Sequence, residues 1–297
     1  MKTNYLFLSL AIVAMLFASC EADDTSEIVI NNTDNSTNTT NNNSGGGDTD
    51  PDPEPTGEDI NISGTYTEDL ILDPINNYTL NGSLIMAPGT KLEIPAGMTI
   101  NAAADGANVY IAISQGAIID AQGTADEPII MTSNAASPGA GDWGGLILLG
   151  RAPINSVAAG GTSTSEIGGL PYGGSDPADY SGIISYMRIE YSGGAADGQS
   201  ENNGFSFYGV GNGTIVNHIQ MFVGADDGAE FFGGTVNVNY IAVFGAEDDS
   251  IDWTEGWSGT ITDAYVEHNL DFTTEYDKGI EADGFNTDIG NNSNPVY

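Results

Sequence analysis

The sequence predicts an all-β protein, a right-handed parallel β-helix that follows an N-terminal signal peptide and a tether. From about residue 59 onward, short apolar runs rich in Val, Ile, Thr, Tyr and Phe alternate with Gly, Asn, Asp and Pro, without a sustained helical period. A Gly-Thr pair recurs at Gly213, Gly234 and Gly259, at steps of 21 and 25 residues. Repeats of this length, each with two or three short strands, are typical of the coils of a parallel β-helix.

Residues 1–19 are predicted to be a signal peptide. Lys2 supplies a positive charge, and an apolar run from Tyr5 to Phe17 follows it, interrupted only by Ser9. The run is about 13 residues long, which suits the apolar region of a signal peptide and is too short to span a bilayer stably. We therefore expect the chain to be exported and cut before residue 20.

Cys20 is the predicted site of lipidation. It is the only cysteine in the 297 residues, so the chain cannot form an internal disulfide. The residues before it, in the segment LFASC, resemble the bacterial lipobox, in which two small residues precede the cysteine. That resemblance implies a diacylglycerol on the thiol and an acylated amino group, and therefore attachment to a membrane through lipid.

The cysteine is followed by an acidic cluster, EADD, at positions 21–24. It resembles the signal that sends lipoproteins of the Bacteroidota to the outer face of the outer membrane, which implies a lipid-anchored protein exposed at the cell surface. An acidic start to a tether is the alternative. Residues 20–58 are rich in Asn, Thr, Gly and Pro and have almost nothing to bury, so we expect this whole segment to be a disordered tether.

The charge balance excludes some classes of partner. Five Lys and Arg face 42 Asp and Glu, a formal net charge of −37 at pH 7. Nucleic acid is not an expected partner, because phosphate binding needs a dense basic surface. Anionic lipid headgroups would be repelled for the same reason. Divalent cations and neutral sugars remain plausible partners, although solubility alone explains much of an acidic excess.

Residues 59–297 are the predicted β-helix domain. The run NHIQMF at 217–222 matches NYIAVF at 239–244, so stacked coils would place Ile219 against Ile241 and Met221 against Val243. From residue 116 to 150 the chain follows the succession GA-x-I-x-A-x-GT, PI-x-x-TS and G-x-W-G-G-L-x-L-x-G. This succession is similar to the β-helix of many surface lipoproteins and secreted proteins of the Bacteroidota. The resemblance implies a fold and assigns no activity.

Two segments depart from the coil pattern. Residues 151–182 are rich in Gly, Ser and Thr and break the coil spacing, which predicts a long loop that either binds a ligand or is a passive insertion. Residues 291–297 look like the entry to another coil rather than a polar cap. Because solenoids need capped ends, we expect the natural chain to continue beyond Tyr297.

Two acidic turns are the predicted metal site. The candidate ligands are Asp226, Asp227, Glu230, Asp248, Asp249 and Asp252. If coils stack at about 4.8 Å, carboxylates from successive turns lie above one another and repel. A bound Ca²⁺ would relieve this repulsion, because it takes 6 to 8 oxygen ligands in flexible geometry. The alternative is that the side chains point into water or accept hydrogen bonds from backbone amides of the turns.

Two tryptophans lie close to these acids in the sequence. Trp253 and Trp257 are candidate ligand-binding residues, because an exposed indole ring beside carboxylates can hold a sugar by stacking and hydrogen bonds. The alternative is that both rings pack in the core of the β-helix.

The sequence therefore favours a binding or structural role at the cell surface, such as adhesion or the binding of glycans, cations or other surface proteins. The alternative is a polysaccharide-active enzyme, a lyase or glycoside hydrolase on a β-helix scaffold. The pair Asp226-Asp227 resembles the adjacent aspartates of polygalacturonases, but the chain has no Gly-His-Gly and no Arg-x-Lys. His218 and His268 lack the close spacing of a metal pair. We therefore assign no catalytic residue.

Overall fold

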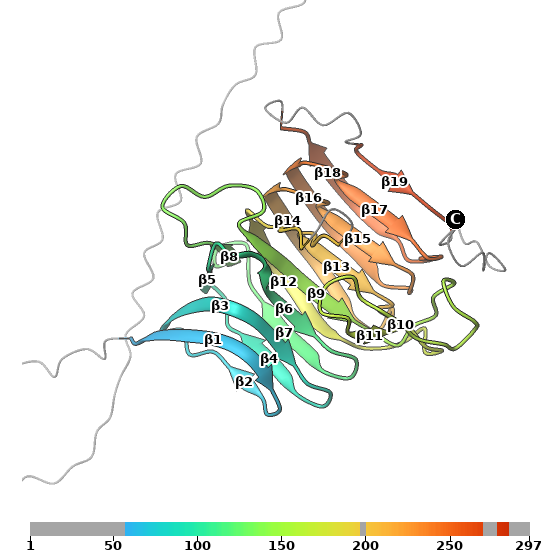
Figure 1. Ribbon diagram of the computed structural model, residues 1–297, viewed down its shortest axis with the longest axis horizontal. Helices are drawn as coiled ribbons and strands as arrows, with labels where there is room; N and C mark the ends of the chain where they lie inside the picture. The colour runs from blue at the N-terminus through green and yellow to red at the C-terminus, as the bar shows by residue number, and fades with distance from the viewer. Residues whose placement is uncertain (1–56, 197–199, 270–277, 285–297) are drawn as a thin grey trace, which may run out of the picture. The chain divides into compact units, whose positions relative to one another are not determined.

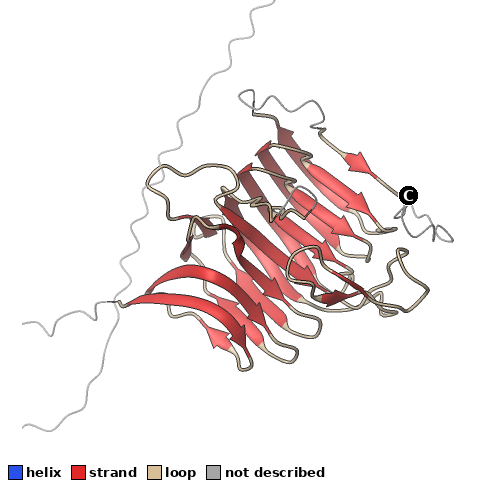
Figure 2. Ribbon diagram, viewed as in Figure 1, coloured by secondary structure: helices blue, strands red, loops and turns tan. Residues whose placement is uncertain are grey.

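The computed structural model describes residues 57–196, 200–269 and 278–284, and all regular structure in these residues is β-strand (Figures 1 and 2). None of the described residues forms a helix long and apolar enough to cross a membrane. The strands are β1 Asp59–Tyr66, β2 Leu70–Ile71, β3 Asn77–Met86, β4 Lys91–Ile94, β5 Thr99–Ala102, β6 Gly106–Ile113, β7 Ile118–Gln122, β8 Ile129–Ser133, β9 Trp143–Leu149, β10 Ser163–Thr164, β11 Pro171–Tyr172, β12 Gly182–Glu190, β13 Phe205–Tyr208, β14 Ile215–Gly224, β15 Ala229–Phe232, β16 Asn237–Ala246, β17 Ile251–Thr254, β18 Ile261–Glu267 and β19 Glu281–Ala282.

Seventeen strands form one continuous parallel sheet that winds as a right-handed β-helix, which confirms the predicted fold class. The coils follow one another from β1 at one end to β18 and β19 at the other (Figure 1). Face 1 of the helix contains β6, β9, β13, β15, β17 and β19. Face 2 contains β4, β7 and the first halves of β12, β14, β16 and β18. Face 3 contains β5, β8 and the second halves of the same four long strands.

Inward-pointing side chains of successive coils stack to form the core. Strands β14 and β16 pair so that Ile219 lies on Ile241 and Met221 lies on Val243, which confirms the predicted repeat register, and all four are buried. Aromatic rings extend the stack along face 1, where Phe207 and Phe231 are fully buried with ring centroids 5.0 Å apart. No coil could bury these side chains alone, so the fold depends on the stacking of neighbours.

The predicted loop at 151–182 folds back onto the β-helix. It contains the short antiparallel pair β10–β11, the one antiparallel pairing among the described strands. Ile154, Ile167 and Tyr172 of this insertion pack with Tyr208 and Phe232 in a second apolar cluster, apart from the core between the coils. The insertion therefore covers the outer surface of face 1 over β13 and β15.

Some sequence predictions lie outside the described residues. The signal peptide, the lipidation site Cys20 and nearly all of the tether fall within residues 1–56. Residues 291–297, on which the predicted continuation of the solenoid rests, also lie outside the described residues. All of these stay predictions.

Candidate carboxylate groove

A row of polar side chains crosses four successive coils on the outer surface of face 1. In the registers of β13, β15, β17 and β19, Ser206 pairs with Glu230, Glu230 with Asp252, and Asp252 with Glu281. Paired positions on neighbouring parallel strands lie about 4.8 Å apart. Three carboxyl groups therefore lie in one line along the helix axis, and two of them, Glu230 and Asp252, are predicted metal ligands.

The turns that lead into β15 and β17 add a second set of acids. Asp226 and Asp227 precede β15, and Asp248 precedes β17. Gly228 lets these turns stack closely, because a Cβ atom there would lie 2.4 Å from the carbonyl oxygen of Ser250. The tight stacking brings Asp226 and Asp227 against the turn of the next coil.

Five of the six predicted ligands meet in two groups. Asp226, Asp227 and Asp248 each place one carboxylate oxygen within 4.8 Å of the others. Asp227, Glu230 and Asp252 do the same. Asp227 belongs to both groups and therefore links the row on the strands to the acids of the turns.

A buried amide adjoins the second group. Asn203 is only 2% exposed, and its Nδ2 donates hydrogen bonds to Glu230 Oε2 at 2.8 Å and to Ser206 Oγ at 3.2 Å. Its Oδ1 has no hydrogen-bond partner within the described part of the chain, and the same holds for Asp252 Oδ1. A buried amide oxygen without a partner costs free energy, so this site has an unused acceptor beside its carboxylates.

Burial and mutual repulsion hold protons on these acids. The pKa of Asp226 rises to about 8, because the group is buried and because Glu201 and Asp248 repel its charge. The pKa of Asp252 rises to about 6, mainly through burial. Burial, followed by neighbouring carboxylates, also raises the pKa of Asp227 and of Glu230 well above their ordinary values. The carboxyls are thus poorly stabilised as anions in the protein alone.

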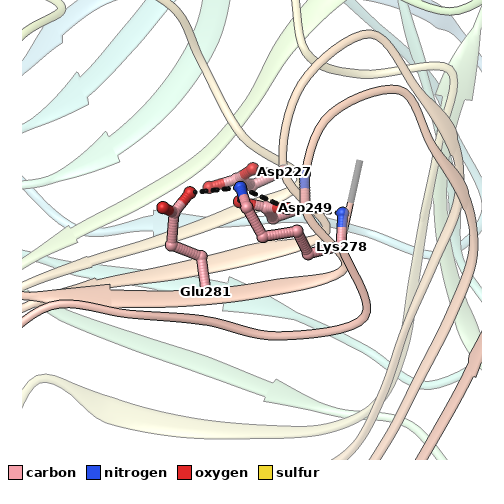
Figure 3. Close-up of polar contacts among 4 residues, drawn as sticks. All are labelled: Asp227, Asp249, Lys278 and Glu281. Atoms are coloured by element: carbon pink, nitrogen blue, oxygen red, sulfur yellow. Dashed lines mark hydrogen bonds and ion pairs between the residues drawn. The ribbon is translucent and has the colours of Figure 1, made fainter. Parts of the chain in front are cut away.

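Asp249 lies outside both groups and has a structural partner (Figure 3). Asp227 Oδ1 accepts a hydrogen bond from the backbone N–H of Asp249 at 2.8 Å, and Asp249 Oδ1 accepts one from the backbone N–H of Lys278 at 2.7 Å. The Lys278 ammonium also lies 3.3 Å from Asp249 Oδ2 and 2.8 Å from Glu281 Oε2. Asp249 therefore stabilises the next turn through backbone amides, which is the alternative that the sequence left open.

The insertion supplies one wall of a hollow beside the row. The hollow has a volume of about 420 Å³ and is lined by Glu230, Asp252 and Glu281 together with residues of the insertion, including Glu166 and Tyr172. Tyr172 is buried, and its hydroxyl donates a hydrogen bond to Glu255 Oε2 at 3.0 Å. The result is an acidic groove, which we call the carboxylate groove, with a protein wall over part of its length.

Comparison with known proteins gives the family. The model of the pectate-lyase-like β-helix domain matches residues 64–297. The chain belongs to this family. No curated protein and no solved structure was found that matches it.

In this pectate-lyase-like β-helix, the two candidate tryptophans lie against the core. Trp257 is 7% exposed, and its indole N–H donates a hydrogen bond to the carbonyl oxygen of Val236 at 3.2 Å. Trp253 is partly buried, with its ring centroid 5.6 Å from that of Trp257. Both rings therefore pack against the core, as in the alternative given above, and a role of either ring in ligand binding stays a prediction.

Sequence reasoning missed several residues of the groove. Asn203 occupies the position that Asp227 has one coil later, because the segment Asn202-Asn203-Gly204 corresponds to Asp226-Asp227-Gly228. Alignment of these turns could have found it. Glu166 reaches the groove only through the folding of the insertion, for which the local sequence gives no signal.

The groove of this pectate-lyase-like domain has two chemical capacities. Carboxylate oxygens on two coils, with an amide oxygen beside them, match the ligands that Ca²⁺ prefers. Carboxyl groups with pKa values of about 6 and about 8 also provide groups that can exchange protons near neutral pH.

Proposed function

We propose that this protein is a lipid-anchored β-helix that binds a divalent cation, Ca²⁺, in the carboxylate groove and acts as a binding module at the cell surface. The observation that supports the cation most directly is the convergence of Asp227, Glu230 and Asp252, whose ligand oxygens lie within 4.8 Å of one another. Asp227 and Glu230 come from one coil and Asp252 from the next, so the scaffold itself holds the ligands together.

The electrostatics favour a cation over an empty cluster. Carboxyls that repel one another gain stability when a divalent ion replaces their protons. The oxygen of Asn203, buried and without a partner in the described residues, would become a further ligand, since Ca²⁺ accepts amide oxygens as readily as carboxylates. A site that includes two or three carboxylates and an amide is of the kind that suits Ca²⁺ rather than Zn²⁺, which prefers nitrogen and sulfur ligands.

The placement at the cell surface comes from the N-terminal sequence. The lipobox-like segment before Cys20 and the acidic residues behind it support lipid anchoring and export to the outer membrane. A long polar tether between Cys20 and the domain would hold the groove away from the membrane. In this proposal the groove faces ligands or partners outside the cell.

Tb³⁺, a luminescent substitute for Ca²⁺, tests where the ion binds. Trp253 directly follows Asp252, so an ion on Asp252 would receive energy from the excited indole and emit green light. We expect saturable Trp-sensitised emission that Ca²⁺ displaces, and we expect Asp252→Asn to weaken it by about tenfold or more. Asp126→Asn, an exposed aspartate between β7 and β8, is the control and leaves it unchanged. Emission that survives Asp252→Asn would contradict this location.

An enzyme that acts on polysaccharide is the second candidate. The family is named for its likeness to pectate lyases. Asp252 in the groove and Asp226 in the turn that adjoins it have pKa values of about 6 and about 8, which suit a base and an acid near neutral pH. Incubation of the protein and Ca²⁺ with a set of glycans would test this alternative. New reducing ends would indicate hydrolysis, unsaturated products would indicate a lyase, and the absence of both would leave the binding role.

A further inference from the structure

A stack of three aromatic rings lies at the corner between faces 2 and 3, away from the carboxylate groove on face 1. Tyr186 of β12, His218 of β14 and Tyr240 of β16 occupy equivalent positions in successive coils. The centroids of Tyr186 and His218 are 4.2 Å apart with planes 10° from parallel. Those of His218 and Tyr240 are 4.3 Å apart at 20°. Each ring therefore covers a face of the next one along the helix axis.

The backbone under this stack is strained. The strands bend here through a residue in the left-handed region, with φ of 45° at Tyr186, 52° at His218 and 60° at Tyr240. Bulky side chains rarely adopt this conformation, which Gly, Asn and Asp tolerate better. The next coil makes the same bend with Asp263, at φ of 58°. Three large rings thus occupy a bend that a small polar residue can also make. Such backbone strain at a surface site points to a function.

The stack ends with an open ring face. Asp263 follows Thr262 and precedes Ala264, the partners of Asn239 and Ile241, so it is the equivalent of Tyr240 in the next coil, and its short side chain takes the position that a fourth ring would have. As a result Tyr240 remains 48% exposed. A groove of about 440 Å³ runs beside the stack, and its lining includes Gln220, Ala242 and Tyr265. This site therefore combines one free aromatic face with the hydrogen-bonding groups of Asp263 and Gln220.

The charges around the groove beside the aromatic stack favour a neutral ligand. Arg188 is the one arginine or lysine in the lining. Its Nε lies 2.7 Å from Glu190 Oε1, and its guanidinium lies over the ring of Phe222, 4.9 Å from the centroid. It therefore has little free charge to offer an acidic ligand. The formal net charge of −37 also repels polyanions such as acidic glycans.

We propose that this corner is a second binding site, which takes a neutral oligosaccharide. One pyranose ring lies with its apolar C–H face on the exposed ring of Tyr240, continuing the aromatic stack, and its hydroxyl groups bond to Asp263 and Gln220. Apolar surface with a few placed polar groups is the usual character of a small-ligand site. The proposal is independent of the carboxylate groove and needs no cation.

The test uses the full chain and four neutral hexasaccharides, of glucose, mannose, xylose and galactose, with hexagalacturonate as the acidic comparison. Calorimetric titration in EDTA should show saturable binding of at least one neutral hexasaccharide and none of hexagalacturonate. We expect Tyr240→Ala to weaken that binding by about tenfold or more, and Tyr240→Phe to change it by less than about threefold, because the ring supplies the contact. Tyr180→Ala removes a tyrosine that is 46% exposed elsewhere and should have no effect.

Asp263→Tyr separates binding from stability. A fourth ring would cover Tyr240, so this variant should stay folded but lose binding, although a bulky residue at this left-handed position costs some stability. If the oligosaccharide bound elsewhere on the molecule, Asp263→Tyr would leave binding intact, and that result would overturn the proposal. Binding of only the acidic hexasaccharide, binding unaffected by Tyr240→Ala, or no binding of any neutral hexasaccharide would each overturn the proposal.

Discussion

Asp227 and Asp249 occupy consecutive turns but differ in the charged groups that surround them. Each accepts a hydrogen bond from a backbone N–H of the following coil. Only Asp249 also has the Lys278 ammonium beside it, whereas Asp227 shares its surroundings with Glu230 and Asp252. The charge of Asp249 is thus balanced by the protein, whereas in our proposal that of Asp227 is balanced by Ca²⁺.

Removal of the Lys278 ammonium should destabilise the last described turn in a pH-dependent way. Burial raises the pKa of Asp249 to about 7, and Lys278→Met would raise it further. A carboxyl with a raised pKa in the folded protein holds its proton there to higher pH than in the unfolded chain, so stability is lost as pH rises. The melting temperature of Lys278→Met should therefore fall below that of the wild type more at pH 8 than at pH 5.

Lys91→Met is the matched control for that comparison. Lys91 forms an ion pair with Glu93 on face 2, where the Glu93 side chain is 36% exposed, whereas that of Asp249 is only 2% exposed. Exposed pairs contribute little, so this variant should melt close to the wild type at both pH values. An equal loss for the two lysine variants would contradict the special role of Lys278.

At the scale of the strands, the regular coils follow directly from the sequence. The spacing of the Gly-Thr pairs and the matched runs at 217–222 and 239–244 predicted the register of β14 and β16, because inward positions must stack on their equals. The insertion at 151–182 was predicted only as a loop. Its Gly, Ser and Thr content indicates a loop, but the contacts of Ile154 and Tyr172 with face 1 depend on tertiary packing that no local pattern encodes.

The aromatic core of face 1 should dominate the stability of its coils. Phe231 is fully buried, and its ring centroid lies 5.0 Å from that of Phe207 and 4.7 Å from that of Trp257. Phe231→Ala should lower the free energy of unfolding by about 3–5 kcal/mol, measured by urea denaturation. Phe244→Ala, which truncates a partly exposed ring on β16, should cost much less. Similar losses for the two variants would show that the stacked core does not dominate.

At the scale of the whole molecule, the protein joins an acidic β-helix to an N-terminal segment with the features of a lipid anchor. The fold was predictable because every coil must stack its inward apolar side chains on those of its neighbours, and the sequence repeats accordingly. The groove was predictable only in part, since Asp227, Glu230 and Asp252 lie in repeated turns and strands while Glu166 reaches them through the insertion. The anchor rests on the sequence around Cys20 alone.

Cys20→Ala tests the anchor in the native host or in a bacterium that lipidates exported proteins. Without the thiol there is no site for the diacylglycerol, so we expect the variant to leave the membrane fraction and appear in the soluble fraction. Ser19→Ala, which keeps a small residue before the cysteine, should remain with the membrane. A Cys20→Ala protein that stays in the membrane fraction would refute lipid anchoring.

The central claim, a cation in the carboxylate groove, is tested most directly by calorimetric titration of the full chain with Ca²⁺ at pH 5 and pH 8, paired with melting temperatures in Ca²⁺ and in EDTA. Because the pKa values of Asp226 and Asp252 rise to about 8 and about 6, the protein in EDTA should lose stability as pH rises from 5 to 8. Ca²⁺ should bind saturably, release protons and raise the melting temperature more at pH 8 than at pH 5. Absence of both binding and a thermal shift at pH 8 would contradict the account.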